Sequence, residues 1–353
     1  MATRRADRRG TSRPEGPEGD EEGVRAIEVR RFGGPEVLEL VDLAPPLPGP
    51  GQLLVEVAVA GVNFRDLLHR AGLFGAEVPF VPGTEGSGRV VEVGPGVEGF
   101  APGERVAWKM GPSYAERCVV AASEAVHVPQ DVDDESAAAV ILQGLTAHAL
   151  ATTVFPVSEG DVALVQAGAG GVGMLLTQIV KMRGGRVLAS VSSPEKQAAA
   201  RAAGADEVVL YGEQGSDLPA AVRELTGDRG ADVVFDGVGA STFDASLASC
   251  RPRGTVVVYG ASSGAVPPFD VMTLMQHGSL GLHRPSVRDF TADRDELDRR
   301  AGELFSWLTG GALFCHIDGR YRLGDAALAQ ERLAARRSVG KLLIGVGTDI
   351  SSR

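Results

Sequence analysis

Residues 161–181, DVALVQAGAGGVGMLLTQIVK, place a glycine-rich turn between two apolar segments. Gly168, Gly170 and Gly173 fit the spacing G-x-G-x-x-G, with a strand pattern before the turn and a helical pattern after it. A second strand pattern follows at residues 186–192. In this setting glycines allow a close approach of the backbone to a pyrophosphate, and the free N–H groups at the helix start stabilise its charge. The motif predicts a dinucleotide site.

The end of the second strand indicates which dinucleotide binds. A site for NAD usually carries Asp or Glu there, which binds the ribose 2′-hydroxyl. Here the strand ends in Ser192 and Ser193, and Lys196 follows, which suits a 2′-phosphate; a solvated helix position is the alternative for Lys196. Glu195 is the counter-evidence, but beside Pro194 we expect it in the first turn of the next helix, facing solvent. The sequence therefore favours NADPH over NADH.

The elements around this turn predict two kinds of structure. From residue 161 to residue 258, short apolar strands alternate with helices, the pattern of βαβ units and a parallel sheet. Residues 23–145 are instead rich in strand and turn signals, such as QLLVEVAVAGV at 52–62. The acidic start of DDESAAAVILQGLTAHALAT predicts a helix between the two regions. A further helix and a closing strand, VGKLLIGVG, follow residue 285.

Composition restricts the classes of function. The 353 residues are 44% hydrophobic and 23% charged, which is typical of a soluble globular protein. A net charge of -11 argues against a nucleic-acid partner and against an anionic membrane surface. The three cysteines form no C-x-x-C pair, so we expect a reducing compartment, the cytoplasm. No segment is predicted to span a membrane, and residues 1–22 are predicted to be a disordered tail, with a mitochondrial presequence as the alternative.

Several spaced motifs together resemble the medium-chain dehydrogenase/reductase superfamily. They are GVNFRDLLHRAG (61–72), VPGTEGSGRVVEVGPGVEGFAPGERV (81–106), LQGLTAHAL (142–150), AGAGGVG (167–173) and YGASSGAVPPFD (259–270). The segment HGSLGLHRPS (277–286) is similar to the zinc-independent quinone oxidoreductases, the zeta-crystallin-like group. The resemblance implies an α/β protein that forms a homodimer, with a homotetramer as the alternative. A GroES-like β-rich catalytic domain would span residues 23–146, completed by 284–348, and a doubly wound Rossmann domain would span residues 147–283.

Departures from the zinc-dependent alcohol dehydrogenases bear on metal binding. That branch carries Cys where this chain has Asn63, and His where it has Thr84. Neither Asn nor Thr is a usual ligand of zinc, and Glu85 alone makes no site. The six histidines show no H-x-x-x-H spacing. The resemblance therefore implies a protein without a metal site, in which an alkoxide would lack a stabilising Lewis acid.

The resemblance assigns cofactor contacts to matching positions. Asn63 corresponds to an asparagine near the nicotinamide, Thr146 to a threonine that touches the cofactor, and Tyr211 to a tyrosine bordering the adenosine phosphate. The other implied contacts belong to the pyrophosphate turn, the 2′-phosphate site, the strand ends and the arginine segments: Gly170, Gly171, Val172, Ser192, Lys196, Gly237, Val238, Gly239, Ala261, Ser262, His283, Arg284 and Arg336 or its neighbour Arg337. Packing is the alternative for Thr146, and solvation for either of the last two arginines.

The predicted reaction is hydride transfer from NADPH to a quinone or an α,β-unsaturated carbonyl, whose developing charge spreads into a quinol or enolate oxygen. Asn63 and Tyr114 are the candidate hydrogen-bond or proton donors. Close bacterial relatives have a tyrosine where this chain has Leu67 and Leu68, which favour an apolar acceptor pocket. Two alternatives stay open: an enoyl-thioester reductase related to polyketide synthase reductase domains, and a non-catalytic NADPH-binding structural or sensor protein.

Overall fold

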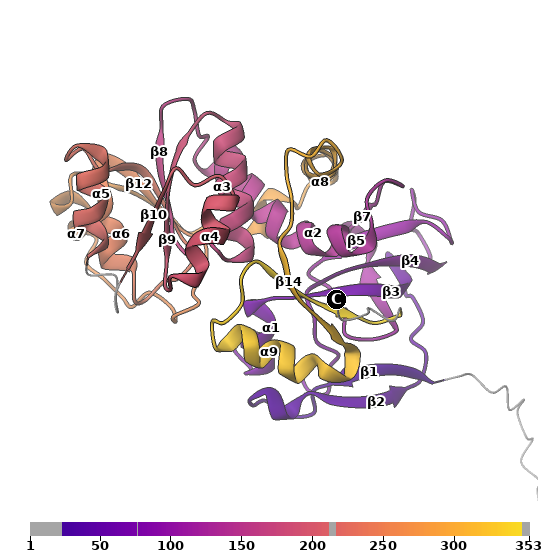
Figure 1. Ribbon diagram of the computed structural model, residues 1–353. Coiled ribbons are helices and arrows are strands. Elements are labelled where there is room, and N and C mark those ends of the chain that lie inside the picture. The colour runs from indigo at the N-terminus through magenta and orange to yellow at the C-terminus, as the bar shows by residue number, and fades with distance from the viewer. Residues whose placement is uncertain (1–22, 76, 212–216, 348–353) are drawn as a thin grey trace, which may run out of the picture.

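A computed structural model describes residues 23–75, 77–211 and 217–347 of the chain. The predicted tail, residues 1–22, lies outside these residues. The described chain forms two lobes, each built on its own large sheet (Figure 1). Helix α2 (Asp134–Ala149) lies at the junction, because it packs on strands of one lobe and on helix α3 (Gly171–Met182) of the other.

A six-stranded parallel sheet forms the first lobe, in the order β10-β9-β8-β11-β12-β13. Its strands are β8 (Val162–Val165), β9 (Arg186–Val191), β10 (Glu207–Leu210), β11 (Ala231–Asp236), β12 (Cys250–Val258) and β13 (Gly281–His283). The helices between them are α3, α4 (Glu195–Ala202), α5 (Leu218–Thr226), α6 (Phe243–Ser249) and α7 (Met272–Gln276). The predicted βαβ units are confirmed. The strand order reverses between β8 and β11, the point where open α/β sheets bind ligands.

A seven-stranded sheet forms the second lobe, in the order β14-β15-β3-β4-β5-β7, with β6 paired to β3. Its strands are β3 (Gln52–Val62), β4 (Glu85–Val93), β5 (Arg105–Lys109), β6 (Arg117–Ala121), β7 (Ala125–His127), β14 (Ile317–Arg322) and β15 (Lys341–Gly345). Around it lie β1 (Val24–Glu28), β2 (Glu39–Leu43), α1 (Phe64–Arg70), α8 (Arg294–Thr309), α9 (Ala326–Ala334) and the short turns η1 (Pro35–Val37), η2 (Ala122–Glu124), η5 (Val287–Phe290) and η6 (Leu323–Asp325). Because β15 pairs antiparallel with β3, the end of the chain completes a sheet begun near its start.

Helix α2 begins where the acidic residues predicted it. The side chain of Asp133 accepts a hydrogen bond from the Ser136 N–H at 2.7 Å, which caps the helix. A π-helical turn, η3 (Leu150–Val154), extends α2. Together they are long and apolar enough to span a membrane by length and composition. Within this stretch, however, 72% of an 18-residue apolar segment is buried inside the protein, so it serves as a core helix. The domain boundary predicted at residues 146/147 falls within α2 and stays a prediction.

Candidate active site

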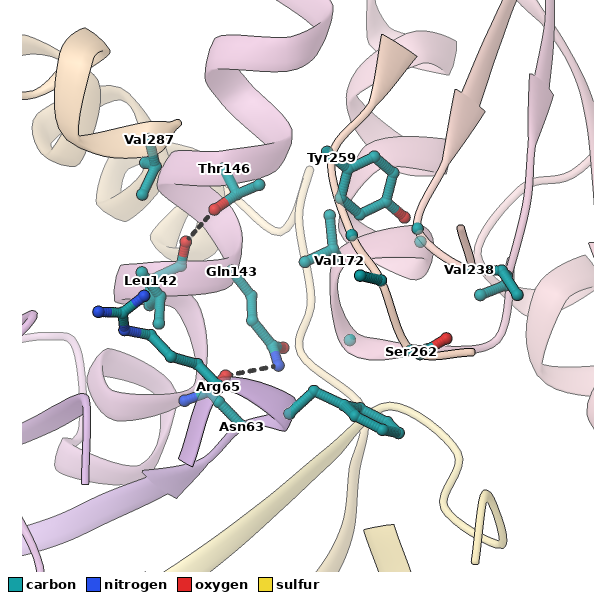
Figure 2. Close-up of a pocket in the computed structure, with 18 of the residues that line it drawn as sticks. Asn63, Arg65, Leu142, Gln143, Thr146, Val172, Val238, Tyr259, Ser262 and Val287 are labelled. Atoms are coloured by element: carbon teal, nitrogen blue, oxygen red, sulfur yellow. Dashed lines mark hydrogen bonds between the residues drawn. The ribbon is translucent and has the colours of Figure 1, made fainter. Parts of the chain in front are cut away.

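A cavity of about 740 Å³ is lined by residues of both lobes. Its walls come from the glycine-rich turn after β8, the carboxyl ends of β9, β11 and β12, helices α1 and α2, and the segment before β15. Figure 2 shows side chains of α2 on one side of this cavity and Val238 and Ser262 on the other. The cavity therefore lies at the reversal point of the parallel sheet.

Most residues predicted to contact a cofactor line this cavity: Asn63, Thr146, Gly170, Gly171, Val172, Ser192, Lys196, Tyr211, Gly237, Val238, Ala261, Ser262, Arg284 and Arg336. Gly239 and His283 are not among the lining residues. Gly239 bends the loop after β11 with a φ of 92°, and His283 ends β13 with an exposed side chain. Of the two alternative arginines, Arg336 lines the cavity and Arg337 does not.

The glycine-rich turn after β8 is closely packed where helix α3 begins. Helix α3 begins at Gly171, with Gly170 as its N-cap, as predicted. A Cβ atom at Gly173 would collide with the backbone carbonyl of Ala167, so this turn requires glycine. A Cβ atom at Gly171 would collide with the side chain of Gln143, which lines the cavity. Gly170, Gly171 and Gly173 also line the cavity at the start of α3, and the N-terminus of a helix fits a pyrophosphate.

Two cationic residues, Lys196 and Arg336, lie close together beyond the end of β9. The Lys196 ammonium donates to the Arg336 carbonyl at 2.8 Å and to the Ser192 hydroxyl at 3.3 Å. Burial and the charge of Arg336 lower the pKa of Lys196. The Arg336 guanidinium donates to the Ser262 carbonyl at 3.1 Å, whereas Glu195 is exposed, as predicted. A bound anion would relieve the repulsion between the two cations, so the site fits a phosphate.

A buried polar network holds Asn63. The Lys341 ammonium donates to the Asn63 Oδ1 at 3.1 Å, to the Val62 carbonyl at 3.3 Å and to the Glu85 carboxylate. Because an ammonium only donates, it fixes the amide oxygen of Asn63 towards Lys341. The amide nitrogen then faces Glu85 at 2.7 Å and Thr84 at 3.4 Å. Both N–H bonds of the amide are directed at protein oxygens. Asn63 therefore has no free N–H for the predicted hydrogen bond to an acceptor.

The same network bears on zinc. The ammonium of Lys341 already pairs with the Glu85 carboxylate, and the amide and hydroxyl beside it belong to Asn63 and Thr84. Amides and hydroxyls are not usual zinc ligands. In the described ranges, no group of three or more His, Cys, Asp or Glu side chains is placed to hold a metal ion. These residues do not fit a zinc ion.

Tyr114 does not reach the cavity. Its side chain is fully buried, and its hydroxyl donates to the Asp66 carboxylate at 3.2 Å. Burial and the charge of Asp66 raise its pKa well above the usual value. The prediction that Tyr114 donates a proton to the acceptor is therefore wrong. Its neighbours in the sequence suggested an exposed loop, but the buried carboxylate of Asp66 comes from a distant helix, α1, and no local pattern reveals it.

One part of the cavity is formed by α1, α2 and η5, and we name it the acceptor end. Its walls are mostly apolar and include Leu68, Leu142, Val287 and Phe290. Leu67 is buried outside the cavity. Arg65 and Gln143 also line it, although the sequence analysis did not single them out. Arg65 belongs to the family motif at residues 61–72 and Gln143 to the motif at residues 142–150. These motifs are the feature of the sequence that could have identified both residues. The Gln143 Nε2 donates to the Asn63 Oδ1 at 3.2 Å, and the Thr146 hydroxyl donates to the Leu142 carbonyl at 2.8 Å (Figure 2).

Comparison with known proteins gives matches over most of the chain. The family model of the alcohol dehydrogenase GroES-like domain matches residues 49–151, and that of zinc-binding dehydrogenases matches residues 171–296. A quinone oxidoreductase of Pseudomonas aeruginosa is 38% identical over 324 residues, which cover 91% of this chain and 99% of that protein. A 2-haloacrylate reductase of a Burkholderia species is 35% identical over 330 residues, covering 91% and 98%.

Solved structures agree with these relatives. A mycobacterial protein complexed with NADPH shares 46% identity at a TM-score of 0.88, covering 91% of this chain and 99% of that one. The quinone oxidoreductase of Escherichia coli complexed with NADPH shares 34% identity at a TM-score of 0.87, with the same coverage. The predicted pair of a GroES-like and a Rossmann-type domain is confirmed. The chain belongs to the medium-chain dehydrogenase/reductase superfamily, in its quinone oxidoreductase group.

Proposed function

We propose that the protein is a zinc-independent, NADPH-dependent oxidoreductase that reduces a quinone or an α,β-unsaturated carbonyl. One observation carries the proposal: a single cavity joins the glycine-rich turn, the cation pair Lys196 and Arg336, and the acceptor end. The relatives' names support it, since one is a quinone oxidoreductase and another a 2-haloacrylate reductase. Two similar structures are complexes with NADPH.

The chain supplies binding, orientation and exclusion of water. NADPH, when bound, supplies the hydride, and one proton completes the reduction of a quinone to a quinol. The turn at residues 170–172 would hold the pyrophosphate, and Lys196 with Arg336 would hold the 2′-phosphate. Leu68 and Leu142 form apolar walls that exclude water from the acceptor. Because the acceptor's own conjugation spreads the developing charge, the reaction does not depend on a metal ion.

Oxidation of NADPH, followed by its absorbance, tests this proposal against the two alternatives. The acceptors are 1,4-benzoquinone, 9,10-phenanthrenequinone, an alkenal and crotonyl-CoA. Reduction of quinones or the alkenal supports the proposal, whereas a strong preference for crotonyl-CoA indicates an enoyl-thioester reductase. Saturable NADPH binding without reduction of any acceptor indicates a structural or sensor protein.

We further infer a homodimer joined at β13, and a cytoplasmic location. Strand β13 is the outer strand of the six-stranded sheet beside β12, so its other edge is available for pairing. The segment that leads to β13 exposes large apolar side chains: Phe269, Val271, Met272 and Met275. An exposed apolar patch beside a strand edge is typical of a protein interface. The cytoplasmic inference is supported by free cysteines: Cys118, Cys250 and Cys315.

A further inference from the structure

Arg65 brings a positive charge into the acceptor end of the cavity. Its side chain lines the cavity and is half-buried. Figure 2 shows it beside Leu142, on the side of the cavity that carries Thr146 and Val287 and across from Val238. The charge therefore lies among the apolar walls where the acceptor is proposed to bind, away from the phosphate-binding turn.

In the part of the chain that the structure describes, no carboxylate forms an ion pair with the guanidinium of Arg65. Among the ion pairs of residues 23–75, 77–211 and 217–347, none involves Arg65. Its central carbon instead lies 4.3 Å from the ring centre of Phe74. This cation–π contact uses none of the guanidinium N–H groups, and no hydrogen bond of the described residues involves them, so they can bind a ligand.

The nearest charges compensate the charge of Arg65 only in part. The adjacent carboxylate of Asp66 is buried and accepts hydrogen bonds from the hydroxyls of Thr84 and Tyr114, at 2.7 and 3.2 Å. Burial and the positive charge of Arg288 in η5 lower the pKa of Arg65, whereas the charge of Asp66 raises it. A guanidinium remains charged despite such a shift. The acceptor end therefore combines apolar walls with a positive potential.

We propose that Arg65 pairs with an anionic group on the acceptor, so that the enzyme prefers a quinone or enone that carries a carboxylate or a similar anion. This inference rests on the proposed function and names the substrate class of the same site. A guanidinium binds a carboxylate through two parallel charge-assisted hydrogen bonds, which gain strength where water is excluded. The pair would orient the acceptor while Leu68 and Leu142 cover its conjugated core.

The kinetic test compares two acceptors with the same quinone core, 1,2-naphthoquinone and 1,2-naphthoquinone-4-sulfonate. The ratio of their kcat/KM values cancels effects that a substitution has on both. We expect Arg65→Met to lower the ratio of sulfonate to parent quinone by about tenfold, the loss of one charge-assisted contact, and Arg65→Lys to retain part of the preference. The matched control is Arg201→Met, which removes an exposed arginine of α4 outside the cavity and should leave the ratio unchanged. A change of less than about twofold in Arg65→Met overturns the inference.

A binding measurement separates failure of this inference from failure of the proposed function. The protein with NADPH added is titrated calorimetrically with 2-naphthoate and with its neutral methyl ester, neither of which needs to react. Tighter binding of the anion in the wild type, lost in Arg65→Met, supports the inference even if no quinone is reduced. Equal binding of both compounds overturns the inference, while quinone reduction in the same preparation would keep the proposed function.

Discussion

The buried ammonium of Lys341 fixes the amide of Asn63, which lines the cavity. It is 2% exposed and contacts Glu85, which is fully buried, and Asn63. We expect Lys341→Met to lower the free energy of unfolding by about 3–5 kcal/mol, because it leaves a buried carboxylate without its counter-charge. Turnover should fall as well, since Asn63, which accepts the hydrogen bond of Gln143, loses the contact that fixes its own amide. Urea denaturation at neutral pH measures the first effect and NADPH oxidation the second.

A double substitution provides the control for Lys341. Adding Glu85→Gln to Lys341→Met removes the uncompensated charge and should restore much of the lost stability. Wild-type stability in Lys341→Met alone would contradict the ion pair.

Arg336 and Arg337 form a matched pair of neighbouring exposed arginines, of which only the first lines the cavity. We expect Arg336→Met to raise the KM for NADPH by about tenfold, because one charge-assisted contact to the 2′-phosphate is lost. The KM for NADH, which lacks that phosphate, should change little. Arg337→Met should leave both constants near wild-type values. An equal rise in the KM values for NADPH and NADH would contradict a contact between Arg336 and the 2′-phosphate.

Among the elements, the start of α3 depends on glycine. Because a Cβ atom at Gly173 would meet the carbonyl of Ala167, Gly173→Ala should push α3 away from the turn. We expect a loss of stability of about 1–3 kcal/mol, as for an overpacked core, together with weaker binding of NADPH. Thermal unfolding with and without NADPH measures both effects.

Gly302 is the control for this helix start. It is exposed within α8, and a Cβ atom there meets nothing within 4 Å. Gly302→Ala should therefore raise stability by about 0.5–1 kcal/mol and leave NADPH binding unchanged. A similar loss of stability in Gly173→Ala and Gly302→Ala would contradict the close contact between Gly173 and the Ala167 carbonyl.

Elements whose signals are local could be predicted from the sequence. The apolar run of β8 and the glycines that follow it determine where α3 begins, and the acidic residues near Asp133 determine where α2 begins. Contacts between distant segments could not be predicted. The register of β15 against β3 pairs Leu342 with Val62, which brings Lys341 next to Asn63. Nothing in the pattern KLLIG distinguishes that buried lysine from a solvated one.

At the scale of the whole molecule, the proposed dimer depends on the apolar segment before β13. Met272 and Met275 are 48% and 57% exposed there. Light scattering during size exclusion should give twice the 36.7 kDa chain mass for the wild type, and close to one chain mass for Met272→Lys/Met275→Lys. The added charges would oppose burial of this patch. Leu328→Lys, on the exposed side of α9, is the control and should remain dimeric. A monomeric wild type would contradict the interface.

The most direct test of the proposed function is the steady-state oxidation of NADPH and of NADH with 1,4-benzoquinone as the acceptor. It examines the phosphate site and the acceptor end together, in one preparation of the whole chain. We expect saturable, quinone-dependent oxidation, with kcat/KM at least about tenfold higher for NADPH than for NADH. No quinone-dependent oxidation, or a preference for NADH, would contradict it.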